Sequence, residues 1–152
     1  MATPAKRSAG QVLLRLCFVA YCIWMIWLLF GQRLGTEVYS QQLADRINWE
    51  PLRTIRRYLM LLSGEKGAAL QRHAVINLVG NVVMFIPLGY CIPRIFPVFR
   101  GFFKTFFICL LLILAVEAIQ YFTMLGTCDI DDLILNMTGV ILGWLLSLIK
   151  RH

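Results

Sequence analysis

Carboxylate and amide side chains recur inside, or directly before, stretches of this sequence that are otherwise apolar. Such groups are costly in hydrocarbon unless they find partners or water, so each is a candidate functional residue. Carboxylates bind amines and hydrogen-bond donors, while amides both donate and accept. The sequence therefore predicts a ligand-binding site composed of Asn77, Asn81, Glu117, Gln120, Asp129, Asp131, Asp132 and Asn136.

The apolar stretches around these residues are long enough to cross a membrane. Spanning the hydrocarbon core takes about 20 mostly apolar residues. Of the 152 residues, 59% are hydrophobic and 15% are charged, which excludes an ordinary soluble protein. We predict an all-α, polytopic membrane protein forming a single domain over 1–152. Its four transmembrane helices are expected at 12–30, 74–92, 102–125 and 133–149.

The polar residues share one depth if the four spans alternate in direction. Glu117 would then lie about 12 Å from the outer end of its span, at 1.5 Å rise per residue. The amides of the second span and the acids before the fourth fall in the same layer. This pattern predicts an acidic, amide-lined pocket that opens on the side opposite the termini. The structural alternative is a buried hydrogen-bond network that holds the helices together.

The net charge is +7, and the basic residues lie between the apolar runs. Anionic lipid headgroups are therefore the expected partners, and nucleic acid is not. The positive-inside rule counts lysine and arginine near the span ends, and the short second loop is basic whereas the third loop has no basic residue, which predicts cytoplasmic termini. The other side has seven basic residues and seven acids, whereas the side that holds both termini has eight basic residues and no acids. Those basic residues are Lys6, Arg7, Arg15, Arg94, Arg100, Lys104, Lys150 and Arg151.

The long first loop contains a second amphipathic pattern. Pro51 can open a helix at its first position. Apolar residues then recur at helical spacing, with basic residues between them. The pattern fits a short helix lying in the membrane interface, or one packed on the bundle with a solvated basic face. The apolar residues are Leu52, Ile55, Leu59 and Leu62. The predicted lipid-phosphate ligands are Arg53, Arg56 and Arg57.

Small residues predict where the helices approach closely. Gly139 and Gly143 form a GxxxG pair on the last span, on the same stripe as Asp132 and Asn136. Such pairs let a second helix come near. Gly80, beside the amides of the second span, is expected to contribute to the same packing.

Three motifs resemble those of the VanZ-like family. They are NxxGNxxxFxPxG from Asn77, ExxQ from Glu117 and DxDDxxxNxxGxxxG from Asp129. A weaker element, NxxPxxTI, begins at Asn48, with Leu52 in place of the usual Phe. The resemblance covers about 48–150. It implies a protein of the bacterial cell membrane associated with resistance to the lipoglycopeptide teicoplanin.

A second departure from the family pattern lies before the aspartates, and the resemblance leaves several mechanisms open. Residues 126–128 replace an Arg that family members often carry. The leading hypothesis is a binding protein for a lipoglycopeptide or a lipid-linked cell-wall precursor. The alternative is an enzyme or a flippase acting on a polyprenyl-linked or phospholipid substrate. In an enzyme, Glu117 would be the general acid, with a raised pKa, and Asp129 and Asp132 would hold Mg²⁺. No other cofactor is expected.

Overall fold

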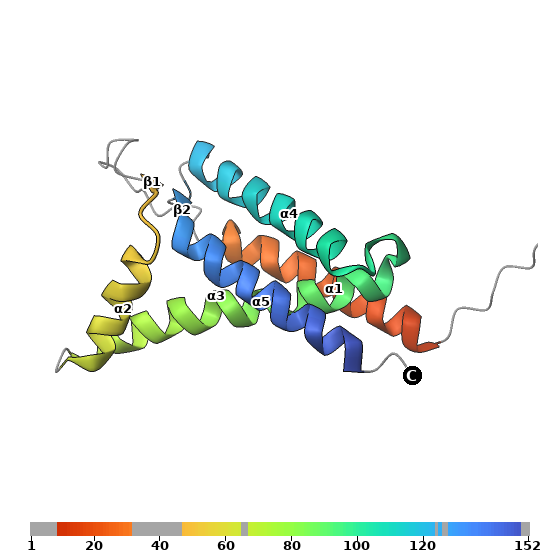
Figure 1. Ribbon diagram of the computed structural model, residues 1–152, viewed down its shortest axis with the longest axis horizontal. Coiled ribbons are helices and arrows are strands. Elements are labelled where there is room, and N and C mark those ends of the chain that lie inside the picture. The colour runs from red at the N-terminus through yellow and green to blue at the C-terminus, as the bar shows by residue number, and fades with distance from the viewer. Residues whose placement is uncertain (1–8, 32–46, 65–66, 124, 126–127, 150–152) are drawn as a thin grey trace, which may run out of the picture.

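The computed structural model describes residues 9–31, 47–64, 67–123, 125 and 128–149. Figure 1 shows long helices gathered in a bundle, with a shorter helix at one end. The elements, in chain order, are α1 (Ala9–Leu29), β1 (Ile47–Asn48), α2 (Arg53–Ser63), α3 (Ala68–Ile95), the 3₁₀ helix η3 (Pro97–Phe99), α4 (Phe102–Phe122), β2 (Cys128–Asp129) and α5 (Ile130–Ile149).

Within the described residues, four helices are long and apolar enough to cross a membrane: α1, α3, α4 and α5. The predicted all-α fold with four spans is therefore confirmed. Three helices, α1, α3 and α5, start earlier than hydropathy predicts. The first turns of α3 are polar, and Gln71 Nε2 ties them to the preceding connection by donating to the Gly64 carbonyl at 3.0 Å. The first turn of α5 contains Asp131 and Asp132, and acids are favourable at the positive end of a helix dipole.

The most extensive helix contact in the described structure joins α3 and α5. A Cβ on Gly139 or Gly143 would overlap a backbone carbonyl oxygen of α3, and one on Gly89 would overlap a carbonyl of α5. The two backbones therefore touch, as the GxxxG pair predicts. Gly80 does not join this packing, since a Cβ there would meet no heavy atom within 4 Å. Gly80 lies two residues before Val82, which touches α5. At about 100° per residue it is about 200° around the helix from Val82, on a face that does not meet α5.

The buried core lies where the four spans converge, and it is apolar. Outside it, large apolar side chains remain exposed along every span, as expected for surfaces that face lipid. The core side chains are Met25, Phe85, Leu88, Ile92, Cys109, Ile113, Met137 and Val140.

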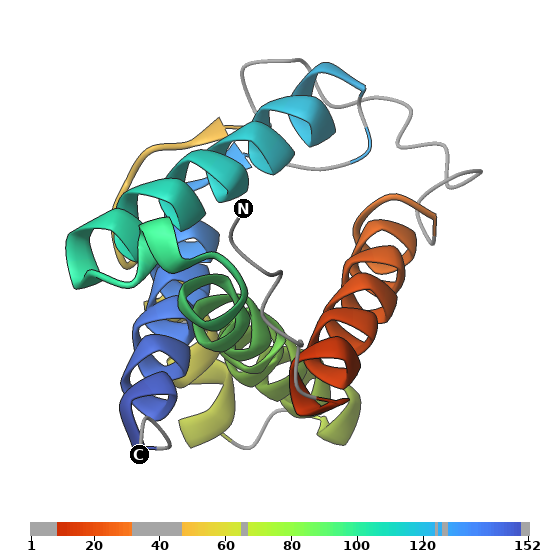
Figure 2. The same cartoon turned by 90° about the vertical axis from the view of Figure 1, so that its right-hand side faces the viewer.

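Helix α1 is the most peripheral span. Figure 2 shows it on one side of the bundle, away from α5. Met25 is its one buried residue in the described structure. Polar contacts tie α1 to its neighbours. The Tyr21 hydroxyl donates to the Met84 carbonyl of α3 at 2.7 Å. At the other end, Gln120 Nε2 donates to the Leu29 carbonyl at 3.0 Å.

The bundle has two chemically different ends. The start of α1 and the end of α5 lie at one of them, which we call the terminal end (Figure 1). Helix α2 and the strands β1 and β2 lie at the opposite end, which we call the loop end. This arrangement is expected when four spans cross the membrane in alternating directions. Which side of the membrane each end faces remains a prediction, and Lys6, Arg7, Lys150 and Arg151 lie outside the described residues.

Candidate functional site

The predicted acids gather at the loop end, where the first loop is fastened to the start of α5. Strands β1 and β2 pair in parallel, with Ile47 opposite Cys128 and Asn48 opposite Asp129. This two-residue pairing joins segments far apart in the sequence. It brings the NxxPxxTI element alongside the DxDD motif.

Asp131 supplies the missing N-cap of α2. Its Oδ1 accepts the backbone N–H of Leu52 at 2.5 Å, and its Oδ2 accepts those of Thr54 at 2.7 Å and Ile55 at 3.0 Å. The first N–H groups of a helix have no partners within the helix, and a carboxylate also suits the positive end of its dipole. Asp131 is 0% exposed. The side chain that caps α2 thus comes from α5.

This cap also explains where α2 begins. Pro51 was expected to open the helix, but the helix starts at Arg53. Leu52 takes a left-handed conformation, with φ 67°, and its side chain cannot accept a hydrogen bond. The tight turn presents three backbone donors to Asp131, those of Leu52, Thr54 and Ile55, while the Arg53 N–H between them donates to the Glu50 carbonyl. The loop therefore depends on a residue of α5 for its local geometry.

Asp129 holds the side chains of the same loop. Its Oδ1 accepts Asn48 Nδ2 at 2.9 Å and the backbone N–H of Asp131 at 2.9 Å, and its Oδ2 accepts Thr54 Oγ1 at 2.6 Å. Asn48 Nδ2 also contacts Thr54 Oγ1 at 3.2 Å. Both carboxylate oxygens of Asp129 are thus engaged within the protein. We call Asn48, Thr54, Asp129 and Asp131 the loop lock.

Asp132 points toward α3 instead. Its Oδ1 accepts Asn81 Nδ2 at 2.7 Å, which joins two of the predicted site residues. Burial raises the pKa of the Tyr58 phenol, and the negative charge of Asp132 raises it further. The Tyr58 ring meets the His73 ring edge-on, with centroids 6.0 Å apart. One face of α2 therefore rests on α3, close to Asp132.

Glu117 belongs to the same electrostatic environment. Burial raises the pKa of the Cys128 thiol, and the charges of Glu117, Asp129 and Asp132 raise it further, in that order. Glu117 itself is buried, with 8% of its surface exposed. Acids from α4, β2 and α5 thus act on one thiol at the loop end.

The predicted amides do not all join these acids. Asn77 Nδ2 donates to the His73 carbonyl one turn back in its own helix, at 2.9 Å. Gln120 is used to hold α1. Asn136 is buried on α5, one turn after Asp132, and its Oδ1 has no hydrogen-bond partner among the described residues. The predicted set is therefore divided among several contacts.

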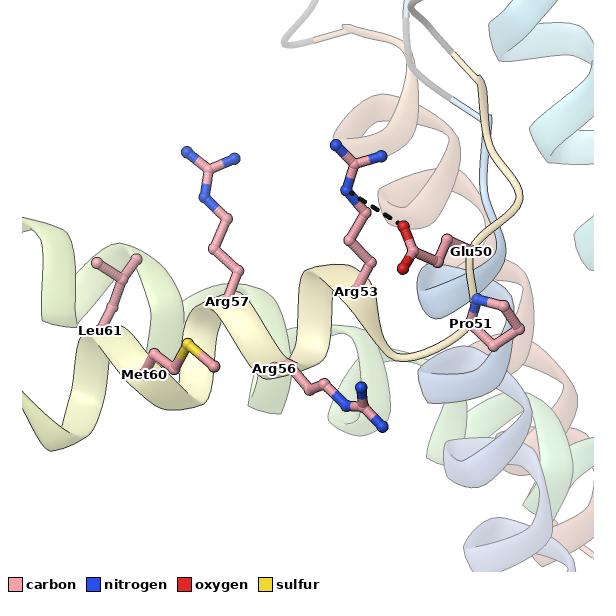
Figure 3. Close-up of a pocket in the computed structure, with 7 residues that line it drawn as sticks. All are labelled: Glu50, Pro51, Arg53, Arg56, Arg57, Met60 and Leu61. Atoms are coloured by element: carbon pink, nitrogen blue, oxygen red, sulfur yellow. Dashed lines mark ion pairs between the residues drawn. The ribbon is translucent and has the colours of Figure 1, made fainter.

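The predicted lipid-phosphate arginines line a pocket of about 350 Å³ on the exposed side of α2 (Figure 3). In that view, Arg53 and Arg57 project to one side of the helix and Arg56 to the other. Arg53 Nε lies 3.8 Å from Glu50 Oε2, and both side chains are largely exposed, so this ion pair is weak. The pocket wall also contains Glu50, Pro51, Met60 and Leu61.

Helix α2 has features both of a helix lying in the membrane interface and of a helix packed on the bundle. No residue of α2 is fully buried, and its contact with α3 uses half-buried side chains. Leu59 and Met60 are exposed beside the arginines. Leu59, one of the four residues of the predicted apolar face, is 53% exposed. An exposed strip that combines apolar and basic side chains suits a membrane interface.

The carboxylate groups of Asp129 and Asp132 are poorly arranged to hold a divalent cation. The Asp129 oxygens accept hydrogen bonds from Asn48 and Thr54, and one oxygen of Asp132 accepts Asn81. In the part of the chain that the structure describes, no group of three or more Asp, Glu, His or Cys residues is arranged to hold a metal ion. The oxygens that a Mg²⁺ ion would need are therefore already used to hold the loop and α3.

Sequence reasoning missed Asn48, Thr54 and Tyr58 as members of this site. Asn48 and Thr54 lie in the weaker motif, so their spacing was noted without a role being assigned. Tyr58 stood among arginines and apolar residues and gave no separate signal. Residues 126 and 127, where the family Arg is replaced, lie outside the described residues.

The fold and the loop lock define a polytopic helical membrane protein whose first loop is fastened to its last span. The sequence profile of the VanZ/LLP1 family matches residues 16–151, so the chain belongs to that family. The association with glycopeptide (teicoplanin) resistance that the motifs imply holds at the level of the family.

Comparison with individual proteins gives a similar result. The chain is 37% identical to Protein VanZ of Enterococcus faecium over 77 residues, which make up 50% of this chain and 47% of that protein. The chain thus spans about half the length of this relative. No solved structure matches the chain.

Proposed function

We propose that this protein is a multi-pass protein of the bacterial cell membrane, with its termini in the cytoplasm and its loop end outward. There it binds a phosphate-bearing amphiphile, and a lipid-linked cell-wall precursor is the ligand class that fits. The observation that carries the proposal is the arginine-lined pocket on α2, a helix whose position is fixed by Asp131.

The charge that α2 presents to a ligand is basic. Three arginines, Arg53, Arg56 and Arg57, line the pocket with one acid, Glu50, so its net charge is positive. The carboxylates of Asp129 and Asp131 are turned inward and accept hydrogen bonds from the loop. Guanidinium groups form strong, geometrically specific contacts with phosphate oxygens. A diphosphate therefore suits this surface better than a cationic amine does.

The pocket also has a place for a lipid chain. Met60 and Leu61 continue its wall with apolar surface. Because α2 is held at one end by the loop lock and along one face by α3, it is preorganised, which reduces the entropic cost of binding. The proposed role is binding, and no chemical step is assigned to Glu117.

A lipoglycopeptide is the second candidate ligand. It is favoured by the convergence of acidic charge from Glu117, Asp129 and Asp132 on Cys128. An amine of the antibiotic would be attracted to that region, and its acyl chain to the exposed apolar surface of the spans. This alternative assigns recognition to Glu117 and Asp132 instead of to the arginines.

The test compares two ligands on purified protein in phosphatidylcholine nanodiscs. The probes are a short-chain polyprenyl diphosphate and teicoplanin. The variant is Arg53→Gln/Arg56→Gln/Arg57→Gln, and the control is Arg72→Gln, an exposed arginine outside the pocket. Hydrogen bonds to charged groups contribute about 1.5–3 kcal/mol each, so we expect the Kd of the diphosphate to rise tenfold or more in the triple variant only.

Unchanged diphosphate binding in the triple variant would contradict the proposal. Teicoplanin binding that survives in the triple variant but is lost in Glu117→Gln and Asp132→Asn would instead favour the second candidate. Each variant is first checked for normal thermal unfolding, so that loss of binding is not mistaken for loss of fold.

A further inference from the structure

The terminal end of the bundle contains a second basic pocket, which has no part in the function proposed above. Arginines from α1, from α3 and from the connection before α4 line a cavity of about 140 Å³. None of the described residues that line it is acidic. Its wall consists of Gln11, Leu14, Arg15, Arg94, Ile95, Pro97 and Arg100.

Arg94 is held in place by the protein. One of its terminal nitrogens, Nη2, donates to the Ser147 carbonyl near the end of α5 at 2.9 Å, and its guanidinium lies 4.5 Å from the centre of the Tyr90 ring. Its Nε is buried and has no hydrogen-bond partner among the described residues. Arg94 therefore has a structural role and also presents a fixed positive charge to the cavity.

Arg15 and Arg100 have no such structural explanation. In the described part of the chain, neither guanidinium group forms a hydrogen bond or an ion pair. Three like charges around one small cavity repel each other unless an anion lies between them. The arrangement therefore fits an anionic group at this position.

Two apolar grooves adjoin the basic pocket. One, of about 470 Å³, shares Arg15 and Ile95 with it and continues along α1 past Val19 and Ile26. The other, of about 450 Å³, shares Leu14 with it and continues past Tyr90 toward Ile86, away from the terminal end. A charged pocket at a membrane surface, with an apolar groove on either side, has the shape of a headgroup site between two acyl chains.

We propose that the terminal end binds one anionic phospholipid, with its phosphate held by Arg15, Arg94 and Arg100 and its acyl chains in the two grooves. Basic pockets between membrane helices bind anionic headgroups in this way. A free phosphate would use the arginines and leave both grooves without a role. The site lies at the opposite end from α2 and is independent of its arginines.

Native mass spectrometry of the detergent-purified protein tests this proposal. The probes are phosphatidylglycerol, phosphatidylcholine and inorganic phosphate. The variant is Arg15→Gln/Arg100→Gln, which leaves the structural contact of Arg94 intact, and Arg15→Lys/Arg100→Lys restores the charge. The control is Lys104→Gln, an exposed cation of α4 outside the pocket. All are made with the α2 arginines replaced by glutamine, so that this site alone is measured.

We expect one tightly bound phosphatidylglycerol, with an apparent Kd that rises tenfold or more in the double glutamine variant. The lysine variant should regain most of the affinity, and Lys104→Gln should change it little. Equal binding of phosphatidylcholine would overturn the proposal, since it would leave the arginines without a role. Equal binding of phosphatidylglycerol to the glutamine variant, or displacement of the lipid by millimolar phosphate, would overturn it as well.

Discussion

At the residue scale, the acids of the DxDD motif are neighbours in sequence but contact different parts of the protein. Asp131 caps a helix, Asp129 holds the side chains of the loop, and Asp132 contacts α3. The sequence identified all three as costly polar residues near a membrane span. It could not identify the partners of Asp131, because these are backbone groups more than 70 positions away. Backbone donors have no signature in the side-chain pattern.

The first residue-scale prediction concerns Asp131→Asn. The amide keeps one acceptor oxygen but turns an NH₂ group toward buried N–H donors, so at least one of them loses its partner. We expect the free energy of unfolding to fall by about 2–3 kcal/mol. Faster proteolysis within the first loop should accompany this loss. Thermal unfolding in detergent and limited proteolysis measure the two effects.

Glu50→Gln is the matched control for Asp131→Asn. It removes an acid from the same loop, but one whose exposed 3.8 Å pair with Arg53 contributes about 0–1 kcal/mol. If both variants had equal stability, the assigned role of Asp131 as the cap of α2 would be incorrect.

The second residue-scale prediction uses Cys128 as a reporter of the acidic charge. Its thiol pKa is raised by burial and then by Glu117, Asp129 and Asp132. Only the thiolate reacts with alkylating agents, so alkylation should require a higher pH than an ordinary thiol does. Replacing Glu117 by Gln removes a negative charge, which lowers the thiol pKa and speeds alkylation at a fixed pH.

The measurement is the pH dependence of alkylation in a variant that retains only Cys128. Asp132→Asn should shift the midpoint in the same downward direction as Glu117→Gln, whereas Glu50→Gln should leave it in place. An upward or absent shift with Glu117→Gln would show that its charge does not reach Cys128.

At the scale of elements, the sequence predicted the spans well because a single property, mean hydropathy over a helix length, defines them. It predicted the ends less well, since the first turns of α3 are polar and yet helical. The GxxxG pair was read correctly because glycine spacing alone specifies a close contact. Gly80 was misread because its neighbours in sequence did not reveal which face of α3 meets α5.

The element-scale prediction contrasts two glycines. A Cβ on Gly143 would overlap the Ile86 carbonyl oxygen, so Gly143→Ala must push α3 and α5 apart, at a cost of about 1–3 kcal/mol. Gly80→Ala adds the same methyl group where there is space. It should be neutral or stabilising by roughly 0.5–1 kcal/mol, because alanine favours the helix.

Thermal unfolding of the two alanine variants in the same detergent distinguishes these effects. A Gly143→Ala protein that is as stable as Gly80→Ala would mean that α3 and α5 do not pack through this glycine. Helix content by circular dichroism should be unchanged in both variants, because the contact lies between helices and not within one.

At the scale of the whole molecule, each end of the bundle collects its own chemistry. The terminal end has arginines from two spans and one connection, and the loop end has the acids, the loop lock and the basic helix α2. The sequence predicted the layer of acids from their depth alone. It did not predict that the carboxylates of Asp129 and Asp131 bind the first loop. Such contacts depend on the rotation of each helix about its axis, which hydropathy does not determine.

The last prediction is the orientation of the molecule. Arginine and lysine near span ends are retained on the cytoplasmic side. At the terminal end, Arg94, Arg100 and Lys104 surround the short connection between α3 and α4, whereas the connection between α4 and α5 at the loop end has no lysine or arginine. Met60 on α2 and Val98 in η3 are both well exposed, and they lie at opposite ends of the bundle. In a cysteine-free background, a membrane-impermeant maleimide applied to intact cells should label Met60→Cys and not Val98→Cys. Permeabilised cells, in which both should react, provide the control. The reverse pattern would put α2 in the cytoplasm, where its arginines could not meet an outer-leaflet precursor, and the proposed function would fail with the topology.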